Sequence, residues 1–217
     1  MPTFNCSAIL FDLDGVLMDS TGAVDRQWRA WGLQKGVDGD EIMAIAHGVR
    51  ALEVIQRVAP HLDAKAEVEE FERHEAQDNE GIVAMPGAVE LLHSIPQGRW
   101  CVVTSGGRFL ASERMKYCGL PVAELFVTAD DVVHGKPHPE PYLKGAKLVG
   151  FAPEDCLVIE DAPAGIAAAH AGGIRVVGVA STYPAGRLAE ADAVVGRTAQ
   201  IKVRSNGAGK LAVELMY

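Results

Sequence analysis

Residues 7–15 read Ser-Ala-Ile-Leu-Phe-Asp-Leu-Asp-Gly, an apolar run that ends in two carboxylates and a glycine. A short apolar run bounded by turn residues predicts a buried strand, here over residues 7–13. The strand would deliver Asp12 and Asp14 at its carboxyl end, where Gly15 lets the chain turn. Both carboxylates would then reach one site.

Outside residues 19–83, short apolar strands alternate with amphipathic helices. Further strands are expected at 100–104, 124–128, 156–160, 175–179 and 193–195, and helices at 88–94, 109–118, 139–149 and 164–171. Residues 201–216 predict a hairpin that turns at Ser205-Asn206-Gly207. This alternation predicts an α/β fold with a doubly wound, Rossmann-like parallel sheet, in which ligands bind beyond the carboxyl ends of the strands.

Residues 19–83 differ in character, because they are rich in charge and carry helical periodicity with few strand signals. Helices are expected at 23–31, 48–58 and 64–76, the last with a solvated outer face. We therefore expect two parts, a core formed by 1–18 and 84–217 and a small helical domain inserted at 19–83.

The amino-acid composition limits the kinds of partner that the protein is expected to bind. About half of the residues are apolar (48%), which supports a real core without disulfides, and the formal net charge is −9 with no basic run. Binding to nucleic acid or to an anionic membrane is therefore not expected. The four cysteines are scattered with no Cys-x-x-Cys pair, which favours buried thiols over a disulfide framework or a zinc site. The first residues show no signal-peptide pattern, so a cytoplasmic protein is expected.

The residues at the strand ends suit phosphoryl transfer. A carboxylate can attack phosphorus to form an acyl phosphate once positive charge relieves the repulsion by the phosphate oxygens. Asp12 suits this nucleophilic role, and Asp14 suits proton transfer to the leaving alkoxide and later from water. Asp12 and Asp161, with a backbone carbonyl and waters, are the hard ligands that Mg²⁺ prefers.

Other polar groups follow the remaining strands. Lys136, between Gly135 and Pro137, could neutralise Asp12 and a phosphoryl oxygen together, and Thr104 could donate its hydroxyl to the phosphoryl group. The segment Ser105-Gly106-Gly107 offers backbone N–H groups near a helix start. Taken singly, each motif has a plain alternative: a solvated turn or calcium loop at 12–15, a helix cap at 104–106, a loop lysine, and a helix cap at 160–161. Their combination in this order favours one active site.

These motifs resemble those of the haloacid dehalogenase superfamily. Asp12-Leu13-Asp14-Gly15-Val16 is similar to its first motif, Thr104 to its second, Lys136 to its third and Glu160-Asp161 to its fourth, and the insert is similar to its helical cap. Three longer stretches resemble the branch with glycerol-phosphate, 2-deoxyglucose-6-phosphate and broad-range sugar phosphatases. They are His47-Gly48-Val49-Arg50, residues 135–145 (GKPHPEPYLKG) and residues 158–166 (VIEDAPAGI).

The resemblance implies a role for each matching residue. It implies Asp12 as nucleophile, Asp14 as general acid and base, and Thr104 and Lys136 as phosphoryl ligands. It further implies that Asp12, Asp161 and the carbonyl of Asp14 hold Mg²⁺, with Glu160 acting through a metal-bound water. An aspartate at position 14 fits a phosphatase or a phosphomutase; dehalogenases of the superfamily lack a carboxylate there, and its transport ATPases carry threonine.

The insert should select the substrate. With the resemblance, we expect Arg50 to bind a distal substrate hydroxyl or to help close the insert, and His47 to contact the sugar or to support Arg50. Trp28 and Trp31 are expected in the core of the insert, and Asp19 is expected to brace the hinge as a turn acceptor.

The sequence therefore predicts a Mg²⁺-dependent phosphatase of small sugar or polyol phosphates, acting as a monomer or a homodimer. A sugar phosphomutase is the first rival, and a non-catalytic binding module the second.

Overall fold

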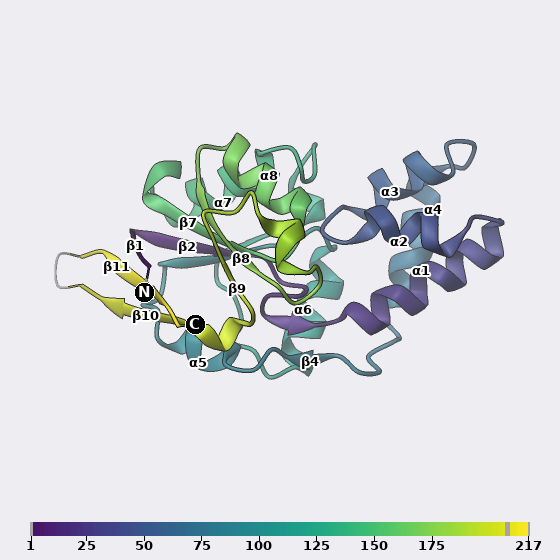
Figure 1. The fold of residues 1–217 in the computed structure, drawn as a ribbon. Helices are drawn as coiled ribbons and strands as arrows, with labels where there is room; N and C mark the ends of the chain where they lie inside the picture. The colour runs from purple at the N-terminus through teal and green to yellow at the C-terminus, as the bar shows by residue number, and fades with distance from the viewer. Residues whose placement is uncertain (1, 207–208, 217) are drawn as a thin grey trace.

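A computed structural model describes residues 2–206 and 209–216. Its centre is a six-stranded sheet with the order β6-β5-β2-β7-β8-β9, in which every neighbouring pair is parallel (Figure 1). The strands of this sheet are β2 (Ala8–Phe11), β5 (Trp100–Val103), β6 (Phe126–Val127), β7 (Cys156–Glu160), β8 (Arg175–Val179) and β9 (Ala193–Val195). The predicted parallel α/β sheet is confirmed.

Helices cover both faces of the sheet (Figure 1). Strand β2 is wholly buried, and its alternate side chains serve two cores: Ile9 and Phe11 face one, Ala8 and Leu10 the other. The first core is closed by α5 (Ala88–His93) and α6 (Arg108–Tyr117), and the second by α7 (Glu140–Val149) and α8 (Pro163–Ala171).

The two ends of the chain pair in a separate antiparallel sheet with the order β1-β11-β10. Its strands are β1 (Thr3–Cys6), β10 (Ile201–Ser205) and β11 (Leu211–Leu215). The predicted hairpin is present as β10 and β11, although its turn residue Gly207 lies outside the described residues. Strand β1 had no sequence signal, because its outward side chains are exposed and its pairing comes from the distant β11.

Four helices of the insert pack around their own apolar cluster, to the right of the sheet in Figure 1. They are α1 (Thr21–Lys35), α2 (Gly39–Ala46), α3 (Ala51–Val58) and α4 (Ala64–Glu75). A two-stranded ribbon of β3 (Met18–Asp19) and β4 (Val83–Ala84) carries the chain out and back. Helix α2 was not anticipated, and the helix expected from residue 48 begins at Ala51, so that Arg50 is its N-cap residue and not part of a helical face.

The small predictions within the fold have clear outcomes. Cys6, Cys101 and Cys156 are buried free thiols, and Cys118 is free and partly buried. Trp28 and Trp31 are buried in the insert cluster, with their rings edge to face. Asp19 accepts from the backbone N–H and the hydroxyl of Thr21 at the start of α1, as expected of a turn acceptor. No helix among the described residues is both long and apolar enough to cross a membrane.

The sheet order decides where the polar residues meet. Strand β2 lies between β5 and β7, so the residues that follow these three strands are neighbours at the carboxyl edge of the sheet. Asp12 follows β2, Thr104 follows β5, and Glu160 and Asp161 end and follow β7. This edge is the place where ligands bind in parallel sheets whose connections diverge to both sides.

Candidate active site

Asp12 is the first residue beyond β2, and its backbone N–H donates to the carbonyl of Ile159 at 3.0 Å. The chain then turns at Gly15, whose φ of +78° suits glycine. A side chain at Gly15 would also overlap the carboxylate of Asp161. The glycine therefore allows the loop after β2 to lie against the residue that follows β7.

Lys136 reaches into this edge from the loop before α7. Its ammonium contacts Asp12 Oδ1 and lies 2.9 Å from Glu160 Oε1 and 3.2 Å from the carbonyl of Val103. The side chain is 1% exposed. Burial alone would lower the pKa of Lys136, but the charges of Asp12 and Glu160 outweigh it and raise that pKa. Lys136 is therefore a permanently charged group beside Asp12.

Glu160 is fully engaged with protein donors. Its Oε1 accepts from Lys136 and from the hydroxyl of Tyr142 at 3.0 Å, and its Oε2 accepts from the backbone N–H groups of Asp161 and Ala162 at 2.7 Å each. A side chain at Gly165 would overlap this carboxylate, so the glycine in α8 makes room for it. The structure thus shows Glu160 holding Lys136 and shaping the turn after β7.

Three buried carboxylates lie together here, since Asp12, Glu160 and Asp161 each offer an oxygen within 4.8 Å of the others. Burial, followed by the charges of Glu160 and Asp12, raises the pKa of Asp161 well above its ordinary value. Burial also raises the pKa of Asp12, against the lowering effect of Lys136. When all three carboxylates are ionised, one lysine leaves an excess of buried negative charge, and this charge needs a counter-ion. The oxygen donor set therefore fits a hard divalent cation.

Asp14 has different surroundings from Asp12. Its side chain is 37% exposed, accepts from the hydroxyl of Ser20, and lies 3.9 Å from the guanidinium of Arg114. Arg114 in turn forms an ion pair with Glu75 at 3.1 Å. Burial raises the pKa of Glu75 to about 7, with Arg114 opposing that rise. Asp14 thus lies close enough to the buried Asp12 to affect it, and it also lies near the cationic Arg114.

Residues 104–106 form a tight turn after β5. The hydroxyl oxygen of Thr104 accepts from the N–H of Gly106 at 3.1 Å, and the hydroxyl of Ser105 donates to the carbonyl of Gly48 in the insert at 2.9 Å. Thr104, Ser105 and Gly106 all line the cavity described below. The turn therefore borders the site, and it does not cap α6, whose N-cap residue Gly107 has no side chain and so makes no side-chain cap hydrogen bond.

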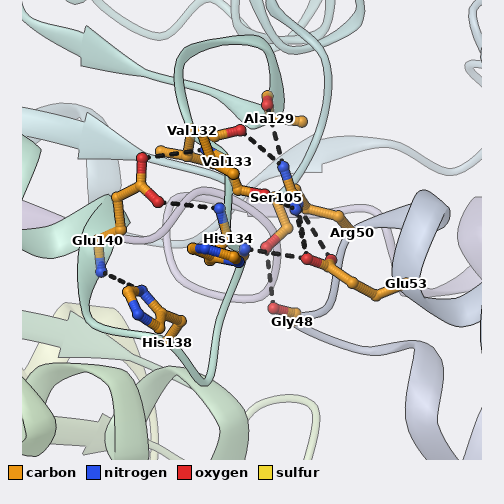
Figure 2. A network of polar contacts seen from close by, with 11 residues as sticks. Gly48, Arg50, Glu53, Ser105, Ala129, Val132, Val133, His134, His138 and Glu140 are labelled. Carbon is orange, nitrogen blue, oxygen red and sulfur yellow. Dashed lines mark hydrogen bonds and ion pairs between the residues drawn. The ribbon is translucent and has the colours of Figure 1, made fainter.

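Arg50 lies at the seam between insert and core, as Figure 2 shows. Its guanidinium donates to the carbonyls of Val132 at 2.9 Å and Val133 at 2.8 Å, and it pairs with Glu53. Glu53 also accepts from the N–H of Gly135 at 2.9 Å, next to Lys136. Arg50 is not among the residues that line the cavity, and the substrate contact expected of it stays a prediction.

A cavity of about 90 Å³ lies between the carboxyl edge of the sheet and the insert. The core contributes residues such as Asp12, Asp14 and Asp161, and the insert borders the space with α1, α4, residues 46–49 and Ala51. His47 lines it, with its ring edge against Tyr183; burial lowers the pKa of this imidazole, and the charge of Asp14 opposes that shift. Most of the predicted residues thus border one cavity, whereas Lys136, Glu160 and Arg50 do not line it.

Sequence reasoning missed Arg114, Glu72 and Glu75, all of which line the cavity. A signal was present, because Arg114 falls on the buried stripe of α6 with Leu110, Ala111 and Met115. Glu75 likewise lies one turn after the buried Phe71 on α4. A charged residue on the apolar face of a helix indicates a buried polar contact. The partner in that contact is known only once the packing of α4 against α6 is seen.

Comparisons with known proteins agree with this geometry. A family model described as haloacid dehalogenase-like hydrolase matches residues 6–173. Hexitol phosphatase A of Escherichia coli (strain K12) is 40% identical over 214 residues, which cover 96% of this chain and 99% of that protein. Glycerol-1-phosphate phosphohydrolase 2 of Saccharomyces cerevisiae is 35% identical over 225 residues, which cover 97% of this chain and 90% of that protein. The crystal structure of a hydrolase from Pseudomonas syringae superposes with a TM-score of 0.80 at 30% identity, covering 88% of this chain and 94% of that one.

Proposed function

We propose, because the chain belongs to the haloacid dehalogenase-like hydrolase family, that it hydrolyses monophosphate esters of small sugars or polyols through a phosphoryl group carried on Asp12. The observation that carries the proposal is the contact of the buried Asp12 with the buried Lys136 at the carboxyl edge of the sheet, beside two more carboxylates. The substrate class follows the hexitol and glycerol phosphatases to which the chain is similar.

Both aspartates act in each half-reaction, Asp12 on phosphorus and Asp14 on the proton. Asp12 Oδ attacks phosphorus while the ester P–O bond breaks, and Asp14 gives its proton to the departing alkoxide. The now ionised Asp14 then takes a proton from water as the water oxygen bonds to phosphorus and the Asp12–phosphorus bond breaks. Asp14 regains its proton and Asp12 its charge, so the enzyme returns to its starting state. Lys136 and the hydroxyl of Thr104 hold phosphoryl oxygens.

Magnesium is the cofactor that we propose for this site. Asp12, Asp161 and the backbone carbonyl of Asp14 would hold it, and it would supply positive charge against the phosphoryl oxygens. Glu160, whose oxygens already accept four hydrogen bonds, would contact the metal through a water molecule. Thr182 donates to Asp161 and so orients this carboxylate.

We further propose that residues 19–83 act as a cap over a core of residues 1–18 and 84–217. The β3–β4 ribbon is the natural hinge, since it is the covalent connection between the two parts. The contacts Arg50–Val132, Ser105–Gly48 and Glu75–Arg114 cross the seam and hold the cap closed. Opening would break these contacts to admit substrate, and closing would exclude bulk water from the phosphoryl group.

A phosphomutase is the rival that the carboxylate at position 14 leaves open. A mutase must hold a sugar with two phosphates, so it needs cationic groups at the far end of its cavity. Arg50, which is the candidate from the insert, is instead bound to carbonyls and to Glu53. Arg114, which does line the cavity, is paired with Glu75 and lies beside Asp14, so this arrangement favours hydrolysis. A non-catalytic module is disfavoured because Asp12, Asp14 and Asp161 line one cavity and Lys136 contacts Asp12.

Phosphate release with Mg²⁺ tests the proposal. The panel would include glycerol phosphates, hexitol phosphates, hexose 1- and 6-phosphates and pentose phosphates, each with and without a chelator. We expect release of inorganic phosphate from several of these esters and its loss on chelation. Conversion of hexose 1-phosphate to hexose 6-phosphate without free phosphate would instead refute hydrolysis in favour of the mutase, and inactivity on every ester would refute the phosphatase and revive the binding module.

A further inference from the structure

Arg114 lies inside the cavity with bonding capacity that the protein does not use. It comes from α6, its residue exposure is 3%, and it lines the cavity next to Asp14. One terminal nitrogen pairs with Glu75 at 3.1 Å. Among the residues that the structure describes, Nε and the other terminal nitrogen have no hydrogen-bond partner. Buried N–H groups of this kind are rare because they lose their hydration without compensation, so a ligand group is their natural partner.

Two carboxylates face Arg114 from the cap. Glu72 and Glu75 are three residues apart on α4, so both lie on the face of that helix that borders the cavity. Glu72 accepts from the N–H of Gly107 at the start of α6, and a side chain at Gly107 would come within 2.9 Å of that carboxylate. The gap between α4 and α6 is thus lined by acceptors on one side and by free donors on the other.

A hydroxyl group matches this lining, because it donates one hydrogen bond and accepts others. A diol can donate to the carboxylates of Glu72 or Glu75 while accepting from Nε and Nη2 of Arg114. Arg114 and the two glutamates share the cavity with Asp14, the residue that protonates the leaving oxygen, and Arg114 lies 3.9 Å from that aspartate. They are therefore placed to meet the organic part of the ester and not its phosphoryl group.

The charge of the side chains that line the gap between α4 and α6 opposes a substrate with an anionic group in addition to its phosphate. Glu72 and Glu75 bring two carboxylates to this part of the cavity beside Asp14, and Arg114 is already paired with Glu75. A carboxylate or second phosphate on the leaving group would add negative charge at close range in a poorly hydrated space. Repulsion of this kind is a common source of specificity.

We infer that Arg114, Glu72 and Glu75 form a subsite that binds the hydroxyl groups of an uncharged polyol and rejects leaving groups with a second anionic group. The inference rests on the proposed phosphatase activity and deepens it. Cap closure completes the subsite, because Glu72 and Glu75 come from the cap and Arg114 from the core.

A graded set of three-carbon esters tests the hydroxyl contact. The substrates are n-propyl phosphate, 1,2-propanediol 1-phosphate and glycerol 1-phosphate, which differ only in the number of hydroxyls. For the unaltered protein, we expect kcat/KM to rise along the series, by about 10–100-fold for a hydroxyl bonded to a charged group. For Arg114→Met and Arg114→Lys, we expect the rise along the series to be lost, because kcat/KM falls more for glycerol 1-phosphate than for n-propyl phosphate.

The variants separate substrate contact from folding. Arg114→Lys keeps a charge to pair with Glu75 but lacks the fork of donors, and Lys116→Met removes an exposed charge from the same helix as a control. Equal loss of kcat/KM on all three esters in a folded Arg114→Lys would overturn the inference, since it would mean that the residue only supports Asp14 or the fold. Inactivity of the unaltered protein on every ester would refute the phosphatase proposal instead.

A charged analogue tests the rejection of anions. 3-Phosphoglycerate has the glycerol phosphate skeleton with a carboxylate in place of one hydroxymethyl group. We expect the unaltered protein to discriminate strongly against it, and we expect Glu72→Gln with Glu75→Gln to reduce the ratio of the two kcat/KM values by at least about tenfold. An unchanged ratio in the folded double variant would contradict the charge argument.

Discussion

Asp12 and Asp14 are separated by one residue, yet their surroundings give them different chemistry. Asp12 is 4% exposed and contacts Lys136, so it is fixed where a phosphoryl group would be attacked. Asp14 is more exposed and is held by the hydroxyl of Ser20. It therefore has access to the leaving group and to water, as an acid and base must.

The role of Asp14 predicts a dependence on the leaving group. In Asp14→Asn, alkyl phosphates should lose roughly 10²–10⁴-fold in kcat, because their alkoxide needs a proton. p-Nitrophenyl phosphate carries a leaving group that departs without one, so its first step should persist while hydrolysis of the intermediate slows. We expect a rapid burst of nitrophenol, equal to the enzyme concentration, followed by slow turnover. Equal slowing of both ester types without a burst would remove Asp14 from both steps.

Removing Lys136 should affect stability as well as activity. Lys136→Met leaves Asp12 and Glu160 buried without their cationic partner, which costs roughly 3–5 kcal/mol in comparable buried pairs. Denaturant unfolding should show this loss of unfolding free energy, partly restored by Mg²⁺, together with a loss of phosphate release. The control is Lys147→Met, which removes an exposed lysine from α7. Full activity and stability in Lys136→Met would contradict the account of the buried cluster.

Helix α3 connects the cap to the loop that carries Lys136. Arg50 at its N-terminus binds carbonyls of that loop, and Glu53 in its first turn accepts from Gly135 (Figure 2). Cap position and loop conformation are therefore coupled through one short element. Glu53→Ala should remove the hydrogen bond from Gly135 and the ion pair with Arg50.

We expect Glu53→Ala to raise KM and to speed hydrogen exchange of the amides at 132–136, because the closed cap and the loop lose a shared anchor. Exposed Arg57 on the same helix provides the control variant Arg57→Ala. Unchanged exchange at 132–136 in Glu53→Ala would show that the loop is held by other contacts.

Helix α7 is joined to the same loop by Glu140. The N–H groups of Val133 and His134 donate to its carboxylate at 3.0 and 2.9 Å and, with Lys144, lower its pKa to about 2. Since the folded protein binds this proton more weakly than the unfolded chain, the contribution to stability is complete above about pH 4.5 and is lost as the pH falls towards 2.

Glu140→Gln should therefore be less stable than the unaltered protein at pH 7, and the difference in Tm should narrow between pH 5 and pH 3. Glu154→Gln, at an exposed position outside this loop, should show no such pH-dependent gap. A Tm difference that stays constant from pH 7 to pH 3 would mean that the Glu140 carboxylate contributes no charge-dependent stabilisation.

At the scale of elements, the sequence predicted those whose pattern is local. β7, β8 and β9 have the predicted bounds, because an apolar run ended by polar residues is sufficient to define a buried strand. β1 and α2 were missed. β1 is half exposed and depends on the distant β11, and α2 begins at Gly39, a residue type that weakens the helical signal. The helix expected at 48–58 begins only at Ala51, so Arg50 is the N-cap residue of α3 and not a residue within the helix.

Across the whole molecule, the sheet order explains why distant motifs meet. Strand β2 lies between β5 and β7, and this order brings the ends of three strands to one edge under the cap. The motifs at these strand ends were evident in the sequence because their residue types and order carry chemistry. Arg114 and Glu75 were not, because their pairing depends on how α4 of the cap sits on α6 of the core.

The most direct test of the account is whether Asp12 carries the phosphoryl group. The protein would be mixed rapidly with glycerol 1-phosphate and Mg²⁺, quenched in acid, and the peptide containing Asp12 analysed by mass spectrometry. We predict a gain of one phosphoryl group on Asp12, and neither this adduct nor phosphate release in Asp12→Asn. Sustained phosphate release by Asp12→Asn, or a phosphoryl group on another residue, would contradict the account.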